Sequence, residues 1–312
     1  EESHPNTASI STPYHGITIS ALIMAAVSAL GAYHFNSGNE FTAFGVALWF
    51  SSIGLILYAF VPRRANLIRW MMRVGQGFRV YVGENRAAML ALALIVFFGT
   101  LARFQNFADV PPEMTSDHLE KLLDAQRVKD GAFDVFFQGN GGREPLQMYL
   151  LAAYSSLTGA PLNFDALKLI AALEGILALP AMYALGVTLM GNRNPRLGVW
   201  VGLAAALFMA FGYWHMAIGR VSLRIILTPL VTALLLTFLI RGMRSQSRTD
   251  WVLAGLTLGI GLYTYQAVRM LPLVVIAAAA LAFVTYARTF AQRRTLLMNF
   301  IALVMVAFVV FV

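Results

Sequence analysis

Long runs of apolar residues alternate with shorter polar segments along most of the chain. A helix needs about 20 residues to cross the roughly 30 Å hydrocarbon layer of a membrane, at about 1.5 Å of rise per residue. Nine runs approach that length: Ile17–Phe35, Phe41–Val61, Ala87–Arg103, Phe164–Leu189, Leu197–Trp214, Ser222–Ile240, Trp251–Tyr265, Met270–Ala287 and Leu297–Val312. The pattern therefore predicts an all-α, polytopic membrane protein with about nine transmembrane helices.

One long segment, residues 104–163, interrupts this pattern with a mixture of charged and apolar residues. An amphipathic helix at the membrane interface is predicted there by apolar residues at helical spacing: Leu119, Leu122, Leu123 and Val128. A second such helix is predicted for residues 145–157, because proline is favourable in the first turn of a helix. Connections of this length are usually functional when they are ordered.

The composition supports a membrane location. The 312-residue chain is 59% hydrophobic and 12% charged, whereas soluble domains are about 45–50% apolar and about 25% charged. So few charges cannot cover a water-facing exterior, which excludes a soluble enzyme. The lack of cysteine excludes disulfides, CxxC redox pairs and thiolate metal sites.

Basic residues are unevenly distributed over the connections between the apolar runs. Successive connections lie alternately on the two sides of the membrane and so form two sets. One set carries fourteen arginines, and the other carries eight arginines and lysines over more residues. Because the cytoplasmic connections of membrane proteins are enriched in Lys and Arg, we place the first set, and by parity the N-terminus, in the cytoplasm. Segment 104–163 is then extracytoplasmic. The net charge of +8 is no indication of nucleic-acid binding, since no run of five like charges occurs.

Two regions are expected along the chain. Residues 1–86 form an N-terminal membrane extension of two helices with a basic cytoplasmic loop, and residues 87–312 form the main transmembrane domain with its outer loop 104–163. The chain begins with Glu1 rather than Met and stops inside an apolar run at Val312. We expect the membrane domain to be incomplete at this C-terminus.

The outer segment offers two groups of candidate residues. Asp117 and Glu120 have the spacing of a capping box with Asp117 as N-cap. The same position holds a carboxylate just outside the bilayer, where Asp117, with His118 beside it, is a candidate for catalysis. Arg143 and Glu144 open the second helix, and the simplest interpretation of this pair is a solvent-exposed ion pair.

Arginines on the same side form a third group. Arg220 and Arg224 lie four residues apart, so that on one helix both guanidinium groups face the same way. Arg269 follows Tyr265 in a later connection. Basic and aromatic residues often anchor helices at the interface, but three arginines on the less basic side would form a phosphate site if they converged.

Two charges fall inside a predicted span, where charges are costly. Lys168 is near enough to the end of the span for its amine to reach the interface. Glu174 has no evident partner and is a candidate for helix packing or for lining a cavity. The sequence contains no GxxxxGK[ST] phosphate loop and no HExxH metal motif.

Four short segments follow one another on the predicted outer side: Asp117-His118, Arg143-Glu144-Pro145-Leu146, Gly219-Arg220-Val221 with Arg224, and Tyr263-Thr264-Tyr265 with Arg269. In this order they resemble the multi-pass glycosyltransferases of the GT-C type. The resemblance is to the bacterial dolichyl-phosphate-mannose-protein mannosyltransferase-like and aminoarabinose-transferase-like group, glycosyltransferase family 39-like, over roughly residues 87–272. His118 stands where many members have Glu, so a paired-carboxylate site does not carry over.

The resemblance implies transfer of a sugar from a polyprenyl-phosphate carrier to an acceptor at the outer face of the bacterial cytoplasmic membrane. Asp117 would be the general base, and His118 and Glu144 would orient the base or the acceptor. The arginines would stabilise the departing phosphate. The substrate-binding residues would be Arg143, Arg220, Arg224, Tyr265 and Arg269. No cofactor and no metal ligand is predicted, although some relatives use a divalent metal and the resemblance leaves one open.

Two other functions stay open. A non-catalytic, transferase-like subunit would pack with other membrane proteins in a larger complex, and its N-terminal helices would be the docking surface. A transporter is the third hypothesis. It is disfavoured because the sequence has no clear internal repeat and few charges at mid-membrane depth.

Overall fold

The structure, a computed structural model, describes residues 19–60, 67–191, 194–285 and 287–311. Within these ranges the protein is all-α and contains no strand. Its helices are α1 (Ile19–Asn36), α2 (Ala43–Phe60), α3 (Leu67–Glu84), α4 (Arg86–Phe104), α5 (Ser116–Lys129), α6 (Leu146–Thr158), α7 (Phe164–Gly191), α8 (Pro195–Phe211), α9 (Tyr213–Arg220), α10 (Leu227–Ser245), α11 (Arg248–Gly261), α12 (Leu271–Thr285) and α13 (Phe290–Phe311). Short 3₁₀ helices add η1 (Gly139–Gly141), η2 (Arg224–Ile226) and η3 (Gln266–Met270).

Within the described residues, seven helices are long and apolar enough to cross a membrane, or eight if the bent pair α8 and α9 is one span. The predicted all-α, polytopic class is confirmed at this level, but the number nine is not. Helix α11 has only 14 residues, which cover about 21 Å. The predicted run 197–214 is not one straight helix, because the chain bends by 48° between α8 and α9. Three predicted span ends, Ile17, Val61 and Val312, lie outside the described residues.

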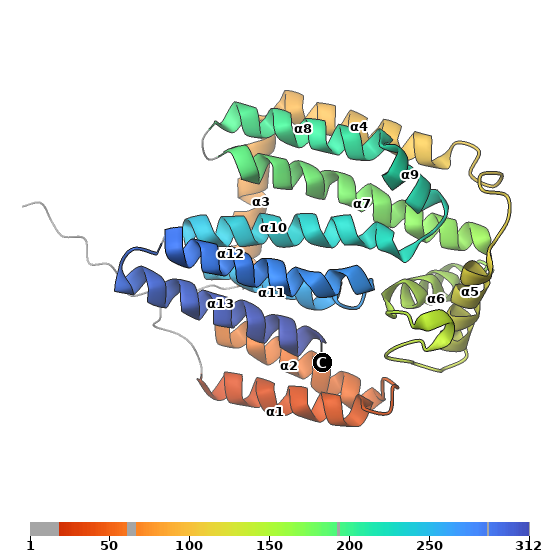
Figure 1. The fold of residues 1–312 in the computed structure, drawn as a ribbon, viewed down its shortest axis with the longest axis horizontal. Helices are drawn as coiled ribbons and strands as arrows, with labels where there is room; N and C mark the ends of the chain where they lie inside the picture. Colours follow the sequence, from red (N-terminus) through yellow and green to blue (C-terminus); the bar gives the residue numbers. More distant parts are fainter. Residues whose placement is uncertain (1–18, 61–66, 192–193, 286, 312) are drawn as a thin grey trace, which may run out of the picture.

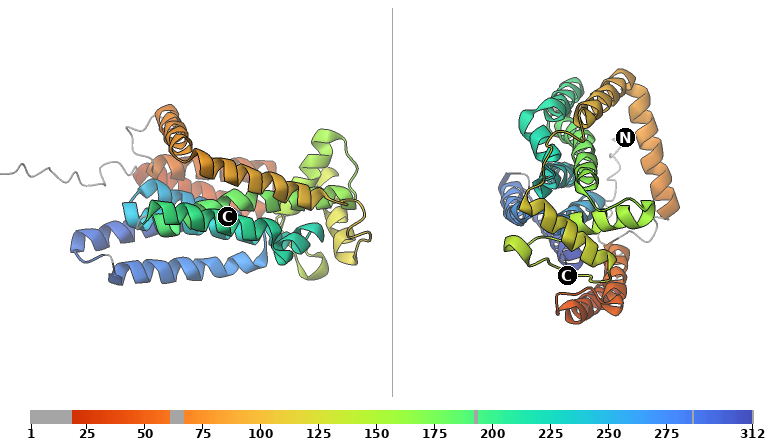
Figure 2. Two further views of the ribbon diagram at one scale, coloured as in Figure 1. Left: turned by 90° about the horizontal axis from the view of Figure 1, so that it is seen from above. Right: turned by 90° about the vertical axis from the view of Figure 1, so that its right-hand side faces the viewer.

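The long helices run side by side, and α5 and α6 lie together at one end of the bundle (Figure 1). The C-terminal ends of α7, α10 and α12 and the N-terminal ends of α8, α11 and α13 lie at the opposite end. Helix α3 runs across the direction of the long helices near that opposite end, between α2 and α4 (Figure 1 and Figure 2). The fold therefore separates the long segment 104–163 from the most basic connections of the sequence.

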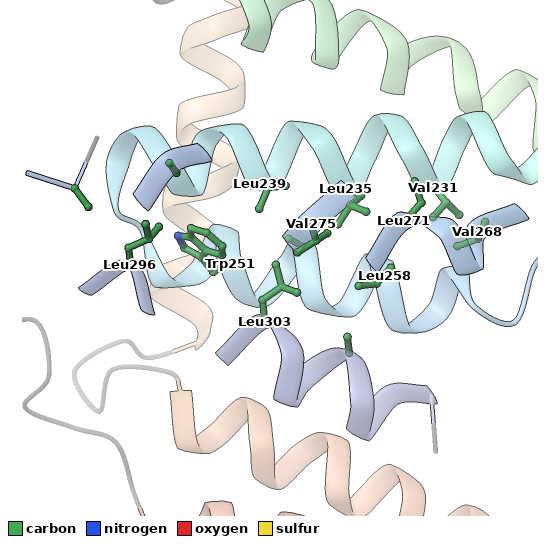
Figure 3. Close-up of a cluster of buried hydrophobic side chains, with 14 residues drawn as sticks. Val231, Leu235, Leu239, Trp251, Leu258, Val268, Leu271, Val275, Leu296 and Leu303 are labelled. Carbon is green, nitrogen blue, oxygen red and sulfur yellow. The ribbon is translucent and has the colours of Figure 1, made fainter. Parts of the chain in front are cut away.

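A buried cluster of side chains joins α10, α11, α12 and α13. Figure 3 shows Leu235 of α10, Leu258 of α11 and Leu303 of α13 converging there, with Trp251 and Leu296 toward one end of the cluster. Val268 of η3 belongs to the same cluster. Close packing of this kind has few alternative arrangements, so it fixes the position of η3 and of the neighbouring Arg269.

The hairpin of α1 and α2 is attached at two places. Ile56 of α2 packs against Val306 of α13 in a buried cluster. At the turn between α1 and α2, the side chain of Asn39 forms two hydrogen bonds of 2.9 Å with the backbone of Phe136, one from the N–H and one to the carbonyl. The turn of the hairpin therefore lies at the end of the bundle that carries α5 and α6.

Helices form at both places where the sequence predicts amphipathic segments, namely α5 and α6. Leu122 and Val128 of α5 are buried against Met148 of α6. Leu119 and Leu123, which the sequence pattern places with them, are exposed instead. Packing against α6 therefore determines which apolar residues of α5 are buried.

Candidate functional site

Charged side chains gather at the end of the bundle where α5 and α6 lie. Most come from α5 and the residues just before α6, and the 3₁₀ helices η2 and η3 bring the others. We call this set the charge cluster: Asp117, Glu120, Lys121, Asp124, Arg143, Glu144, Arg224 and Arg269. Its ion pairs form two groups, one around Arg143 and one around Glu144.

The start of α5 differs from the prediction. The N-cap is Thr115 rather than Asp117, and its partner in the capping box is His118 rather than Glu120. The backbone N–H of Thr115 donates to Nδ1 of His118 across 3.0 Å, so the imidazole takes the place that Glu or Gln usually has. Asp117 lies instead inside the first turn, where the positive end of the helix dipole favours a carboxylate.

His118 is buried and uses both of its ring nitrogens. While Nδ1 accepts from Thr115, Nε2 donates to the carbonyl oxygen of Val221 across 2.5 Å. The ring also packs against Phe164, with 4.8 Å between the ring centroids. Burial lowers the pKa of His118 from its ordinary value of 6.5, which favours the neutral imidazole. This geometry lets His118 hold α5 against the turn after α9 rather than exchange protons with a ligand.

Asp117 is partly exposed, at 34%, and lies 2.7 Å from the ammonium group of Lys121. Lys121 itself is 1% exposed and donates to the carbonyl oxygen of Ser222 across 3.1 Å. Burial lowers the pKa of Lys121, and the neighbouring Asp117 opposes that change. Lys121 is absent from the predicted site, although its spacing of four residues from Asp117 on a helix could have indicated the contact.

Arg143 is the centre of the first group and is 1% exposed. Its Nη2 and Nη1 atoms lie 2.8 Å from Glu120 and Asp124, and its Nε atom lies 3.7 Å from Asp117. Burial favours the neutral form of Arg143, but the two carboxylate hydrogen bonds outweigh it and raise the pKa. The prediction that Arg143 and Glu144 form an exposed ion pair is wrong, because both are buried and each pairs with other residues.

Glu144 is the centre of the second group. It is buried, and its two carboxylate oxygens accept hydrogen bonds of 2.8 Å from Arg224 and 2.9 Å from Arg269. The guanidinium group of Arg224 lies 5.7 Å from the centroid of the Tyr265 ring. Arg224, Tyr265 and Arg269 thus come together around one carboxylate. Arg269 is 54% exposed, so about half of its side chain is open to solvent.

Arg220 lies apart from this group. Its Nη2 atom donates to the carbonyl oxygens of Ala102 and Gln105 across 2.7 and 2.9 Å, at the end of α4. The prediction that Arg220 and Arg224 face the same way rests on a continuous helix. That helix is interrupted because α9 ends at Arg220 and Ser222 has a left-handed φ of 57°.

The two groups of the charge cluster lie within electrostatic range of each other. Arg224 interacts with the charges of Asp117 and Arg143 as well as with Glu144. Lys121 interacts with Arg224 and Arg143. The fold therefore brings the predicted residues Asp117, Arg143, Glu144 and Arg224 to one place, although their positions along the chain are far apart.

An apolar cavity of about 590 Å³ begins beside this cluster. Pro145 and Leu146, which follow Glu144 directly, are part of its lining. The remaining lining residues come from α2, α6, α11, α13 and three connecting segments: Phe41, Ala43, Val46, Trp49, Phe133, Tyr149, Ile260, Tyr263 and Val310. The backbone N–H of Leu146 donates to the carbonyl oxygen of Tyr263 across 3.2 Å, which ties two walls of the cavity together.

The aromatic residues of the cavity present their apolar parts to it. The indole N–H of Trp49 donates to Val310, and the hydroxyl groups of Tyr149 and Tyr263 donate to the carbonyl oxygens of Asp134 and Phe311. Buried Tyr and Trp usually satisfy their polar atoms in this way. The interior of the cavity is therefore suited to hydrocarbon.

The two charged residues of α7 also have partners. Glu174 accepts a hydrogen bond of 2.8 Å from the Gln147 side chain of α6, a contact that the sequence does not reveal. Lys168 donates to the carbonyl oxygens of Phe107 and Ala108 across 2.6 and 3.1 Å and lies 3.0 Å from Asp165. Both residues tie α7 to segments at the α5 and α6 end of the bundle.

Among the described residues, no group of three or more His, Asp or Glu side chains is placed to hold a metal ion. The carboxylates of Glu120 and Asp124 are engaged by Arg143. No protein-family model matches the chain, and no curated protein sequence matches it. A functional proposal therefore depends on the geometry of the charge cluster and of the adjoining cavity.

Proposed function

We propose that this protein transfers a sugar from a polyprenyl-phosphate carrier to an acceptor at the outer face of the bacterial cytoplasmic membrane. The observation that supports the proposal most strongly is the direct connection between Glu144 and the apolar cavity. Arg224 and Arg269 bind Glu144, and the cavity wall begins at the next residue, Pro145. The ligand that fits has an anionic head and a long hydrocarbon chain.

The arginines suit a phosphate head group. Guanidinium groups bind phosphate oxygens through paired, charge-assisted hydrogen bonds. In the absence of ligand, Glu144 provides the anion that these arginines need. An incoming phosphate would replace the carboxylate on Arg269, the more exposed of the two, while Glu144 keeps its contact with Arg224.

Asp117 is the candidate base. Its carboxylate is partly exposed and lies within electrostatic range of Arg224. In the proposed step, Asp117 takes the proton of an acceptor hydroxyl while the hydroxyl oxygen attacks the anomeric carbon. The bond from that carbon to the phosphate oxygen breaks, and the electron pair leaves with the phosphate. A single displacement inverts the anomeric centre, and the arginines stabilise the charge that grows on the phosphate.

The membrane orientation follows from the positive-inside rule. The charge cluster and helix α3, which carries three arginines, lie at opposite ends of the bundle (Figure 1), so the proposed topology has the cluster on the outer side and the N-terminus in the cytoplasm. Helices α10 and α12 both begin at the α5 and α6 end. Helix α11 therefore runs from the end of α10 back to the end of the bundle where α12 begins. In this topology α11 is a short span, and it brings the number of spans to nine.

Binding of polyprenyl phosphate to the purified protein in nanodiscs tests the proposal. Arg269→Ala should weaken binding by about tenfold or more, since a hydrogen bond to a charged group contributes about 1.5–3 kcal/mol. Arg127→Ala is a matched control, because Arg127 is also a half-exposed arginine paired with one carboxylate at the same end. Equal loss of affinity in both variants, or no binding by the unaltered protein, would refute the proposal.

The alternative is a non-catalytic, transferase-like subunit of a membrane complex. One observation favours it: the arginines around Glu144 are already neutralised by that carboxylate, as expected if the cluster only holds the fold together. A purely structural cluster should bind no polyprenyl phosphate, and its Glu144→Gln variant should lose stability without gaining affinity for anions. Co-purification with other membrane proteins in fixed stoichiometry would support this alternative.

A further inference from the structure

Helix α3 has the sequence pattern of a helix that lies flat on a membrane surface. Five of its apolar positions fall on one side of a helix, three or four residues apart: Leu67, Met71, Val74, Phe78 and Val82. Arg69, Arg73 and Gln76 occupy the opposite side of the helical repeat. The helix carries three arginines and one acidic residue, Glu84, so its net charge is positive.

The orientation of α3 agrees with this pattern. It runs across the direction of the long helices near the end of the bundle opposite α5 and α6 (Figure 1 and Figure 2). It connects α2 to α4, and both of these helices are long and apolar enough to cross a membrane. A helix that joins the ends of two spans and lies across them is placed at the level of the lipid head groups.

The apolar side of α3 is open at Phe78, within the part of the helix whose side chains the structure describes. Phe78 is 65% exposed, and Tyr81 and Val82 are partly exposed. Tyr81 contacts Tyr183 of α7 through their hydroxyl groups, 2.7 Å apart, which attaches the C-terminal part of α3 to the bundle. An exposed aromatic side chain on a basic helix is typical of a lipid contact.

The exposed surface of α4 indicates what covers α3. Leu90, Leu94 and Phe97 of α4 are large, apolar and exposed, as expected for side chains that face lipid. Helix α4 begins at Arg86, two residues after α3 ends. Helix α3 therefore leads directly into a helix whose exposed apolar side chains suit contact with lipid.

We infer that α3 is an in-plane interfacial helix, whose Phe78 side inserts between the lipids of one leaflet while its arginines bind anionic head groups. This leaflet is the cytoplasmic one, because cytoplasmic connections are enriched in Lys and Arg and α3 lies at the more basic end of the bundle. The contact is independent of the sugar-transfer site, which lies at the other end of the bundle. It fixes the depth at which α4 enters the membrane.

The lack of cysteine in the sequence permits a direct test with single-cysteine variants. Spin labels are attached to Phe78→Cys and to Gln76→Cys, a control on the opposite side of the same helix, and Phe97→Cys marks the lipid-facing side of α4. The proteins are placed in nanodiscs of phosphatidylcholine and phosphatidylglycerol in equal amounts. Collisions of each label with oxygen, which concentrates in lipid, and with a water-soluble nickel chelate are then measured.

We expect the label at position 78 to resemble the label at position 97, with more oxygen collisions and fewer nickel collisions than the label at position 76. Replacing phosphatidylglycerol with phosphatidylcholine should raise nickel access at position 78, because the arginines lose their anionic partners. Equal nickel access at positions 76 and 78 would overturn the inference. Shielding of position 78 from both reagents would also overturn it, since that result indicates a protein partner.

Discussion

The guanidinium group of Arg269 donates a hydrogen bond of 2.9 Å to the carboxylate of Glu144, although 125 positions of the chain separate the two residues. This contact joins η3 to the residues just before α6. It also connects the exposed arginine of the cluster to the segment that forms the wall of the apolar cavity. In the proposed complex, the charged head and the apolar chain of the ligand would therefore lie side by side.

If Glu144 competes with a phosphate for the arginines, removing its charge should strengthen binding. Glu144→Gln keeps the shape of the side chain and one hydrogen-bond acceptor. We expect the affinity for polyprenyl phosphate to rise several-fold, measured by the same nanodisc binding experiment. Unchanged or weaker binding by a variant that elutes as a monodisperse protein would show that Glu144 does not occupy the phosphate site.

Arg220 and Arg224 should behave differently. Arg224→Ala removes a guanidinium group that binds Glu144 and should weaken polyprenyl-phosphate binding. Arg220→Ala removes contacts to the carbonyl oxygens at the end of α4, and should lower the melting temperature while leaving the affinity unchanged. Reduced affinity in Arg220→Ala at temperatures well below melting would place Arg220 in the binding site after all.

The apolar cavity should distinguish ligands by chain length. Ile260 lines the cavity and is half-exposed, so Ile260→Trp can fill it with little effect on the protein core. We expect weaker binding of long-chain polyprenyl phosphate and unchanged binding of a short-chain prenyl phosphate. Ile276→Trp on α12 is the control, since Ile276 is equally exposed but is not among the cavity residues. Parallel effects on both chain lengths would argue against a hydrocarbon site.

His118 should make stability dependent on pH. Burial lowers its pKa in the folded protein below the ordinary value of 6.5, so between these two pKa values the unfolded chain binds more protons. The free energy of unfolding should therefore fall as the pH falls below about 6.5. Protonation also abolishes the acceptor that Nδ1 offers to Thr115.

The His118→Gln variant tests this dependence. Glutamine can form a capping box with Thr115 but does not titrate. Its melting temperature should depend less on pH below 6.5 than that of the unaltered protein. His34→Gln, at an exposed position on α1, should keep the original dependence. Identical pH profiles for His118→Gln and the unaltered protein would contradict this account.

Sequence periodicity was sufficient to predict the class of the fold and helices α5 and α6. The apolar runs in the sequence are long enough to indicate membrane spans, and hydrophobic spacing marks the amphipathic segments. Such periodicity does not indicate where a helix breaks. The bend between α8 and α9 and the left-handed residue Ser222 direct Arg220 toward α4 and Arg224 toward Glu144.

The candidate site was predictable in part. The sequence suggested a phosphate site if Arg220, Arg224 and Arg269 converged. Arg224 and Arg269 meet at Glu144, whereas Arg220 contacts the end of α4. The partner of Arg143 was not predictable, because its contacts to Glu120 and Asp124 depend on how α5 docks beside α6. The amphipathic pattern of α3 is visible in the sequence, but the distribution of charge alone assigns its arginines to a cytoplasmic loop.

The most direct test of sugar transfer compares the unaltered protein with Asp117→Asn. Both are reconstituted in nanodiscs with polyprenyl-phosphate-linked hexoses and pentoses and with a lipid extract as acceptor, and release of free polyprenyl phosphate is measured. Asp134→Asn, which alters another ion-paired aspartate at the same end, is the control. The account predicts release by the unaltered protein and the control, and a rate lower by about 10²- to 10⁴-fold in Asp117→Asn. Equal release by Asp117→Asn and the control, or none by the unaltered protein with any of these donors, would contradict it.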